Sequence, residues 1–164
     1  MAQRQTIYVP PKGTRGARVM DFIFGLMKPF AGREVGRYQK AKGPDAATFM
    51  GFPVLVLTTV GAKSGKERNT VLGGFPDGKD AWLIIASKGG SATNPGWFHN
   101  IAANPDKVWV QVGDRKFKVN CQSLMGKERD EAYARVVSVS KQYAGYPKKT
   151  DREIPVLRLT PASS

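Results

Sequence analysis

Val54-Leu-Val-Leu-Thr-Thr-Val60 is the stretch that decides the fold of this 164-residue chain. Its apolar and β-branched residues run without polar alternation between Pro53 and Gly61, which is typical of a strand buried on both faces. Further strands are predicted at 68–75, 81–86, 108–112, 115–122 and 155–159. Turn residues, not helices, connect most of them, so a doubly wound parallel sheet is excluded. The pattern predicts an α+β fold, mostly β, in which about six mainly antiparallel strands form a small barrel with helices packed outside.

The segments around these strands predict three helices and one arm. Residues 1–14 hold Pro10, Pro11 and Gly13 without an apolar period, so we expect a flexible arm before a single domain at 15–164. Short helices are predicted at 95–103, capped by Asn94, and at 127–143. The basic stretch 33–43 is expected to be a polar segment that leads into a loop.

The remaining predicted helix, from Arg15 to about residue 30, is amphipathic. Its apolar stripe consists of Val19, Phe22, Ile23, Leu26, Met27 and Phe30. We expect this stripe to pack mainly on the barrel. Because Arg15, Arg18 and Lys28 could meet anionic headgroups, we also expect weak, salt-sensitive contact with the inner face of the cell membrane.

The charge balance predicts an anionic partner. Lys and Arg total 26 against 13 Asp and Glu, giving a net charge of +13. Nucleic acid, an anionic membrane and a polyanionic cofactor all fit this charge. The lone Cys121 and lone His99 exclude an internal disulfide and a Cys/His zinc site, so we expect a cytoplasmic protein without metal.

Two glycine-containing loops are the candidate anion sites. Residues 61–68 carry Lys63, Ser64 and Arg68 at a predicted hairpin turn, but they lack the spacing of a phosphate-binding Walker loop. Residues 86–94 follow a buried strand and lead into the start of a helix. From these residues alone, a shared ligand site and a solvated lysine-rich turn both remain open.

Three ordered motifs carry a resemblance to a known family. "TTVGAKSGKER", "ASKGGSATNPGWFHNIAANP" and "YAGYPKKTDREIPVLRLTP" resemble the deazaflavin-dependent nitroreductases of actinobacteria, with coverage from about Val54 to Pro161. The resemblance implies an FMN-binding-like split β-barrel that binds coenzyme F-420, an 8-hydroxy-5-deazaflavin with a phosphodiester and a polyglutamate tail. It also implies hydride transfer to hydrophobic conjugated acceptors, namely quinones, nitroaromatics or unsaturated lactones.

The resemblance further implies a role for particular residues. The anions of the cofactor are expected on Lys63, Ser64 and Arg68. The ring is expected against Val71, Leu72, Gly73, Ile85, Ala86, Ser87 and Lys88. The acceptor pocket is expected to use Trp97, Phe98, Tyr143 and Tyr146. Tyr143 or Ser87 is the candidate proton donor, with solvent as the alternative.

Two rival functions remain at this point. One is an FMN-dependent oxidoreductase on the same barrel, which the spectrum of the bound cofactor would distinguish. The other is a basic nucleic-acid-binding module, which suits the charge but lacks a helix-turn-helix, RNP or zinc-finger pattern.

Overall fold

The computed structural model describes residues 5–27, 31–40, 48–49 and 51–163. Within them, eight strands form one sheet in which every observed pairing is antiparallel. The strands are β1 (Thr48–Phe49), β2 (Phe52–Val60), β3 (Glu67–Gly73), β4 (Phe75–Pro76), β5 (Trp82–Ile85), β6 (Trp109–Val112), β7 (Arg115–Ser123) and β8 (Val156–Pro161). The six predicted strands are confirmed, and the two-residue strands β1 and β4 are additional.

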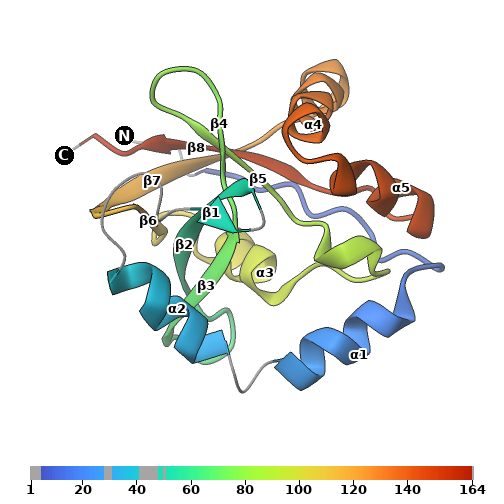
Figure 1. The fold of residues 1–164 in the computed structure, drawn as a ribbon, viewed down its shortest axis with the longest axis horizontal. Helices are drawn as coiled ribbons and strands as arrows, with labels where there is room; N and C mark the ends of the chain where they lie inside the picture. The colour runs from blue at the N-terminus through green and yellow to red at the C-terminus, as the bar shows by residue number, and fades with distance from the viewer. Residues whose placement is uncertain (1–4, 28–30, 41–47, 50, 164) are drawn as a thin grey trace.

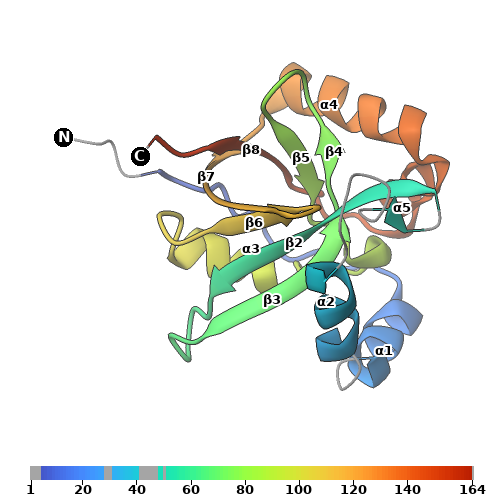
Figure 2. The ribbon, with the colours of Figure 1, turned by 60° about the vertical axis from the view of Figure 1, so that its left-hand side comes forward.

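The order of the strands shows that the sheet curls. It runs β1-β2-β6-β7-β8-β5-β4, with β3 paired to the other edge of β2. Strands β3 and β4 thus stand far apart in the hydrogen-bonded order, yet Gly74 alone joins them in the chain. Gly74 N donates to Pro53 O at 3.0 Å, and a Cβ on Gly74 would overlap the Leu55 side chain. The sheet therefore closes on itself here as a split barrel, as predicted (Figure 2).

Strand β2 is buried on both faces, as its sequence predicts. Leu55 and Leu57 point into the barrel interior, while Val54 and Val56 belong to a separate apolar cluster outside it. The interior is filled mainly by alternate residues of the other strands and by one helix. Its other members include Ile84, Ala86, Phe98, Ile101, Val108, Val110, Val119, Leu157 and Leu159.

Helices cover the barrel on more than one side (Figure 1). They are α1 (Arg18–Met27), α2 (Ala31–Lys40), α3 (Gly96–Ala103), α4 (Gly126–Val139) and α5 (Tyr146–Lys149), with 3-10 turns η3 (Lys88–Gly90) and η4 (Lys141–Gly145). Ala132 and Val136 of α4 pack on Leu83 and Ile85 of β5. The two predicted helices after the first strands are confirmed, but the second ends at Val139 and continues as η4.

Helix α2 was not predicted, since the stretch 33–43 was expected only to be a polar segment leading into a loop. Val35 and Tyr38 are buried against Val54 and Val56 of β2. Two apolar residues among many charged ones make too weak a period to predict a helix, so the helix is stabilised by its contact with the barrel. Residues 41–43 lie outside the described residues.

Helix α1 forms as predicted, but its apolar stripe does not pack on the barrel. Val19 and Phe22 are each 68% exposed and Leu26 is 60% exposed. The helix instead meets η3 through the opposite side, where the Met20 side chain lies on Gly89. The side chains of Met27 and Phe30 lie outside the described residues.

The N-terminal arm is described from residue 5 onward as an irregular segment. Cys121 N donates to Gln5 Oε1 at 2.8 Å, and Tyr8 N donates to Ser123 Oγ at 3.0 Å. Ile7 is buried in the barrel interior. These contacts fasten the segment along β7, and the flexibility of the arm stays a prediction.

Candidate functional site

The β2–β3 hairpin presents the predicted anion-binding side chains to solvent, with Lys63 and Ser64 in its turn and Arg68 on β3. Lys63, Ser64 and Arg68 are exposed, and neither cation forms an ion pair with another described residue. Two backbone hydrogen bonds close the turn: Gly61 N to Lys66 O at 2.8 Å and Gly65 N to Gly61 O at 2.9 Å. The turn is therefore ordered, and its cations remain available to a ligand.

Helix α3 fixes this turn in place through Asn100. Ala62 N donates to Asn100 Oδ1 at 3.0 Å, and Asn100 Nδ2 donates to Thr59 Oγ1 at 3.2 Å. Asn104 Nδ2 adds a hydrogen bond of 3.3 Å to Val60 O. One helix thus ties the end of β2 to the turn, which keeps the exposed cations at a defined position on the barrel.

Gly73 and Tyr143 bring the strand and the C-terminal motif together. A Cβ on Gly73 would lie 2.7 Å from Tyr143 Oη and 2.9 Å from Phe75 Cε2. The missing side chain thus makes room for the tyrosine hydroxyl at the end of β3. Val71 and Leu72, the neighbouring residues predicted to face the cofactor ring, are half-buried.

Tyr143 sits in an aromatic cluster that holds its ring. Its centroid lies 5.3 Å from Phe75 and 5.2 Å from Tyr146, both in edge-to-face geometry. Tyr133 Oη donates to Tyr143 O at 2.6 Å. Burial, the largest cause, raises the pKa of the Tyr143 hydroxyl well above its ordinary value, and neighbouring Tyr146 and Tyr133 add to the shift. The phenol therefore stays protonated at neutral pH and can donate a hydrogen bond.

The loop at 86–94 holds the second group of predicted residues. Ile85, Ala86 and Ser87 are buried. Lys88 adopts a positive φ of 43°, which is uncommon for a residue with a side chain. Its ammonium contacts Asp21 Oδ1 and Thr93 Oγ1, each at 2.9 Å. Lys88 is thus held by α1 and by its own loop.

Trp97 and Phe98 differ in their placement. Trp97 is half-buried, whereas Phe98 is fully buried inside the barrel. Their rings meet edge to face at 6.3 Å. Phe98 therefore supports Trp97 from within the core, and Trp97 alone of the two reaches a surface.

The helix start also differs by one residue from its prediction. Pro95 is the N-cap of α3, and Asn94 makes no capping hydrogen bond to the helix. The Asn94 side chain instead accepts a hydrogen bond from Arg152 Nη1 at 2.6 Å.

Sequence reasoning missed the residues that connect this site to the chain termini. Asp21 accepts from Ser91 Oγ at 2.7 Å as well as from Lys88, and Asp151 accepts from Thr14 N and Arg15 N, each at 2.9 Å. Arg152, within the "TDR" part of the C-terminal motif, is buried beneath the loop. Asp151 and Arg152 lie within the C-terminal motif, which was the available signal, but nothing in the sequence pointed to Asp21, and a single charged residue does not reveal its partner.

A curled antiparallel sheet that closes on itself, with exposed cations at the β2–β3 hairpin, places the protein in the split-barrel class. A family model described as F420H(2)-dependent quinone reductase matches residues 32–161. The chain belongs to this family, and it is therefore an oxidoreductase that uses coenzyme F-420.

Individual relatives agree with this assignment. The chain is 42% identical over 113 residues to an F420H(2)-dependent quinone reductase of Mycobacterium tuberculosis. This alignment covers 66% of this chain and 73% of that protein. A solved F420-H2 dependent reductase is similar at 39% identity and a TM-score of 0.59, covering 65% of this chain and 93% of the other. A solved domain-swapped dimer is similar at 31% identity and a TM-score of 0.60, covering 86% and 98%.

The residues present fit the cofactor of this family. The unpaired cations of the β2–β3 turn match phosphate and carboxylate chemistry. The absence of a side chain at Gly73 lets the Tyr143 hydroxyl lie against the end of β3, the strand expected to border the ring.

Proposed function

We propose that this protein transfers a hydride from reduced F-420 to quinones at the site between the β2–β3 turn and the loop at 86–94. The observation that carries the proposal is the approach of Tyr143 Oη to Gly73. This contact brings together a strand that we expect to border the ring and a tyrosine that we expect to face the acceptor, although 70 residues separate Gly73 and Tyr143 in the chain. Nitroaromatics and unsaturated lactones are the other acceptors that we expect such a site to admit.

Each part of the site has its own task in this proposal. Lys63, Ser64 and Arg68 bind the phosphodiester and the start of the glutamate tail by charge-assisted hydrogen bonds. Two segments border the ring. One is Val71, Leu72 and Gly73 of β3, and the other is Ile85 of β5 with Ala86, Ser87 and Lys88 of the loop that follows. Tyr143, Tyr146 and Trp97 surround the acceptor, and Phe98 holds Trp97 from beneath.

The cofactor supplies the hydride when it is bound, so the protein's task is orientation and electrostatics. An apolar, partly dry pocket holds the acceptor at near-attack distance. The Tyr143 hydroxyl stays protonated because burial raises its pKa, so it can donate to the oxygen on which negative charge develops. Ser87 is the second candidate for this role, directly or through water.

The direct test is binding and turnover with defined cofactors. We expect the protein to bind F-420 far more tightly than FMN, measured by quenching of cofactor fluorescence. Reduced F-420 should then be oxidised by quinones in a panel that also contains nitroaromatics and unsaturated lactones. Comparable affinity for FMN, or no oxidation by any quinone, would contradict the proposal.

We also propose that α1 brings the enzyme to an anionic membrane surface, where an apolar quinone resides. Val19, Phe22, Ile23 and Leu26 form an exposed apolar face on α1. No helix among the described residues is long and apolar enough to cross a bilayer. An exposed apolar helix face flanked by cations is typical of a helix that lies in the membrane interface.

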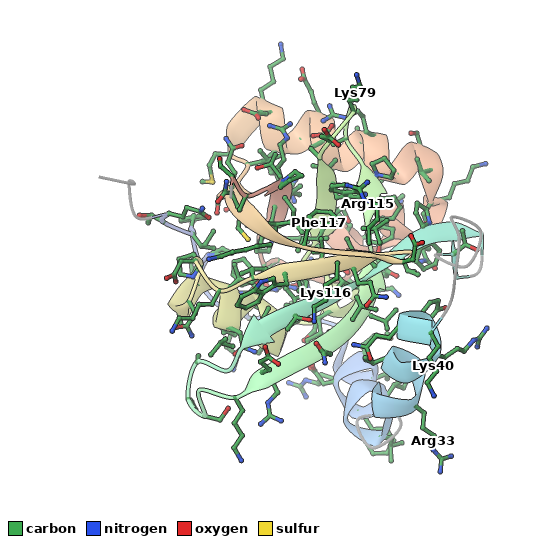
Figure 3. All side chains as sticks on the ribbon, turned by 90° about the vertical axis from the view of Figure 1, so that its left-hand side faces the viewer. Arg33, Lys40, Lys79, Arg115, Lys116 and Phe117 are labelled. Atoms are coloured by element: carbon green, nitrogen blue, oxygen red, sulfur yellow. The ribbon has the colours of Figure 1, made fainter. Side chains whose placement is uncertain are left out.

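Exposed cations on α2 and on the side of the molecule that faces the viewer in Figure 3 support an anionic lipid partner. In Figures 1 and 2, α2 lies at the same end of the molecule as α1. Figure 3 shows Arg33 and Lys40 of α2 on one side of the molecule, with Arg115 and Lys116 of β7 on the same side. All four side chains are exposed. Each cation close to an anionic surface contributes about 1 kcal/mol to binding.

Vesicle flotation tests the membrane contact. We expect binding to vesicles that contain phosphatidylglycerol at low salt, no binding to pure phosphatidylcholine, and loss of binding in a Phe22→Ser and Leu26→Ser double variant. Val139→Ser is the matched control, since Val139 is an exposed apolar residue of α4. No flotation with anionic vesicles at low salt would refute the contact, and retention at high salt would indicate a mainly hydrophobic anchor.

A further inference from the structure

Arg152 is a buried cation whose side-chain hydrogen bonds all go to one loop. Only 4% of its surface is exposed. Its Nε donates to Ser91 O at 3.0 Å, and its Nη2 donates to Ser87 O at 3.0 Å. Its Nη1 donates to Ala86 O at 3.2 Å and to Asn94 Oδ1 at 2.6 Å. The acceptors therefore span the loop from its first residue to its last.

This loop needs such a partner because its own backbone permits other conformations. Lys88, Gly89 and Gly90 have positive φ angles of 43°, 61° and 85°. Two glycines in a row lower the cost of rearrangement, and buried carbonyl groups without donors are costly. The planar guanidinium donates in several fixed directions at once, so it satisfies these carbonyls in only one arrangement of the loop.

The positive charge of Arg152 is not neutralised by a hydrogen-bonded carboxylate. Its four acceptors are three carbonyls and one amide. The Asp21 carboxylate acts on Arg152 through its charge but accepts its hydrogen bonds from Lys88 and Ser91, and Asp151 accepts hydrogen bonds from Thr14 and Arg15. Other charged neighbours include Lys149, beside Gly90, Arg15, whose backbone is hydrogen-bonded to Thr150 and Asp151, and Glu153, which is exposed.

We propose that Arg152 is a positioning residue of the F-420 site, which fixes the loop at 86–94 and leaves a positive charge beneath the residues that border the ring. This inference rests on the proposed function, because it assumes that Ser87 and Lys88 face the cofactor. Its electrostatic consequence is that the bound deazaflavin ring favours its ionised form, since a nearby positive charge stabilises an anion.

The test compares Arg152→Gln and Arg152→Lys with the control Arg158→Gln. Arg158 is a suitable control because it binds Asp77 and Glu128 and makes no hydrogen bond to this loop. In Arg152→Gln we expect the Kd for F-420 to rise about tenfold or more, because buried carbonyls lose their donors. Absorbance titration should also show that the ring hydroxyl of the bound, oxidised cofactor ionises at a higher pH.

In Arg152→Lys the pH at which the ring hydroxyl ionises should lie close to that of the natural protein, because lysine keeps the positive charge. This variant should still leave the amides of residues 87–93 exchanging faster with solvent, because lysine cannot reproduce all four hydrogen bonds. Arg158→Gln should change neither measurement. Natural F-420 affinity in Arg152→Gln, or an equal loss in Arg158→Gln, would overturn the proposal.

Two further outcomes keep the test decisive. If Arg152→Gln does not fold, Asn94→Asp serves instead, since it keeps the acceptor and places a carboxylate on the guanidinium. It should raise the pH of ring ionisation, and an unchanged value would overturn the proposal. If the natural protein does not bind F-420, the proposed function fails, whereas unchanged amide exchange in Arg152→Lys would refute the positioning role by itself.

Discussion

Lys63 and Arg68 differ from several other cations of the chain in their lack of a carboxylate partner. Arg135 and Arg158 bind Asp77, and Lys88 binds Asp21. Those pairs satisfy their cations within the protein. Among the described residues, Lys63 in the β2–β3 turn and Arg68 at the start of β3 have no such pair, which leaves their charge for an external anion.

Replacement of either cation should therefore weaken cofactor binding. We expect Lys63→Ala and Arg68→Ala each to cost about 1–3 kcal/mol of F-420 binding free energy, the scale of a charge-assisted hydrogen bond. The hydride-transfer rate with bound cofactor should be nearly unchanged. Fluorescence titration gives the Kd, and Lys79→Ala, a change at another exposed lysine, is the control. Unchanged affinity in both variants would remove this turn from the anion site.

Loss of the Tyr143 hydroxyl should lower the rate of hydride transfer and not the affinity for the cofactor. Tyr143→Phe is expected to slow single turnover with bound reduced F-420 while the Kd for F-420 stays nearly constant, as the loss of a transition-state donor predicts. Tyr8→Phe, at an exposed tyrosine, should change neither value.

The pH profile provides a second check on Tyr143. Because burial raises its pKa, the hydroxyl of the natural protein stays protonated past the ordinary tyrosine range near ~10. We therefore expect no loss of rate from its ionisation between neutral pH and that range. An unchanged rate in Tyr143→Phe would leave the residue as a pocket wall.

At the scale of elements, α1 is attached by its polar side and not by its apolar stripe. Ala17 N donates to Gly90 O at 3.0 Å, and Asp21 binds Lys88 and Ser91. The same segment is fastened at Arg15, whose backbone carbonyl accepts from Thr150 Oγ1 at 2.8 Å. Polar contacts set the orientation of this helix, so its stripe remains available to another surface.

Acid should loosen this attachment before it unfolds the barrel. Hydrogen bonds from Lys88 and Ser91 lower the pKa of Asp21, and hydrogen bonds from Thr14 and Arg15 lower the pKa of Asp151. A carboxyl with a lowered pKa stabilises the folded state above its ordinary pKa of about 4, and this stabilisation is lost as pH falls below it. We expect the amides of residues 13–27 to lose protection there, measured against the intrinsic exchange rate at each pH, while β2 stays protected.

Asp151→Asn should reproduce part of this loosening at neutral pH. The amide keeps one acceptor oxygen but loses the charge that serves Thr14 and Arg15. Asp106→Asn, at an exposed carboxylate, is the control. Equal exchange in residues 13–27 in all three proteins would show that Asp151 does not fasten this segment.

For the whole molecule, the net charge of +13 should speed the encounter with an anionic cofactor. We expect the association rate constant for F-420 to fall steeply as ionic strength rises, while the dissociation rate changes less. The double variant Arg33→Glu and Lys40→Glu, which lies on α2 and outside the proposed site, should slow association only. Stopped-flow fluorescence measures both rates, and association independent of salt would contradict electrostatic steering.

Local pattern was sufficient for most of the sheet. The apolar run at 54–60 predicts β2, and turn residues at 76–78 and 113–114 predict two of the connections that the structure contains. Helix α2 was missed because Val35 and Tyr38 become buried only when β2 lies beside them. Among the site residues, the exposed cations of the β2–β3 turn could be predicted, since a glycine turn with lysines is a local feature.

The positions of the strands along the chain, the apolar stripes, the excess of positive charge and the three cofactor motifs are properties of consecutive or periodic residues, so they can be read along the chain. The contacts of Tyr143 with Gly73, of Arg152 with the loop at 86–94 and of Asp21 with Lys88 depend on the closure of the barrel. They join residues far apart in the chain, and no local preference specifies such a pairing. Sheet curvature and burial decide it, because a buried polar group must find whichever partner the closed barrel brings within reach.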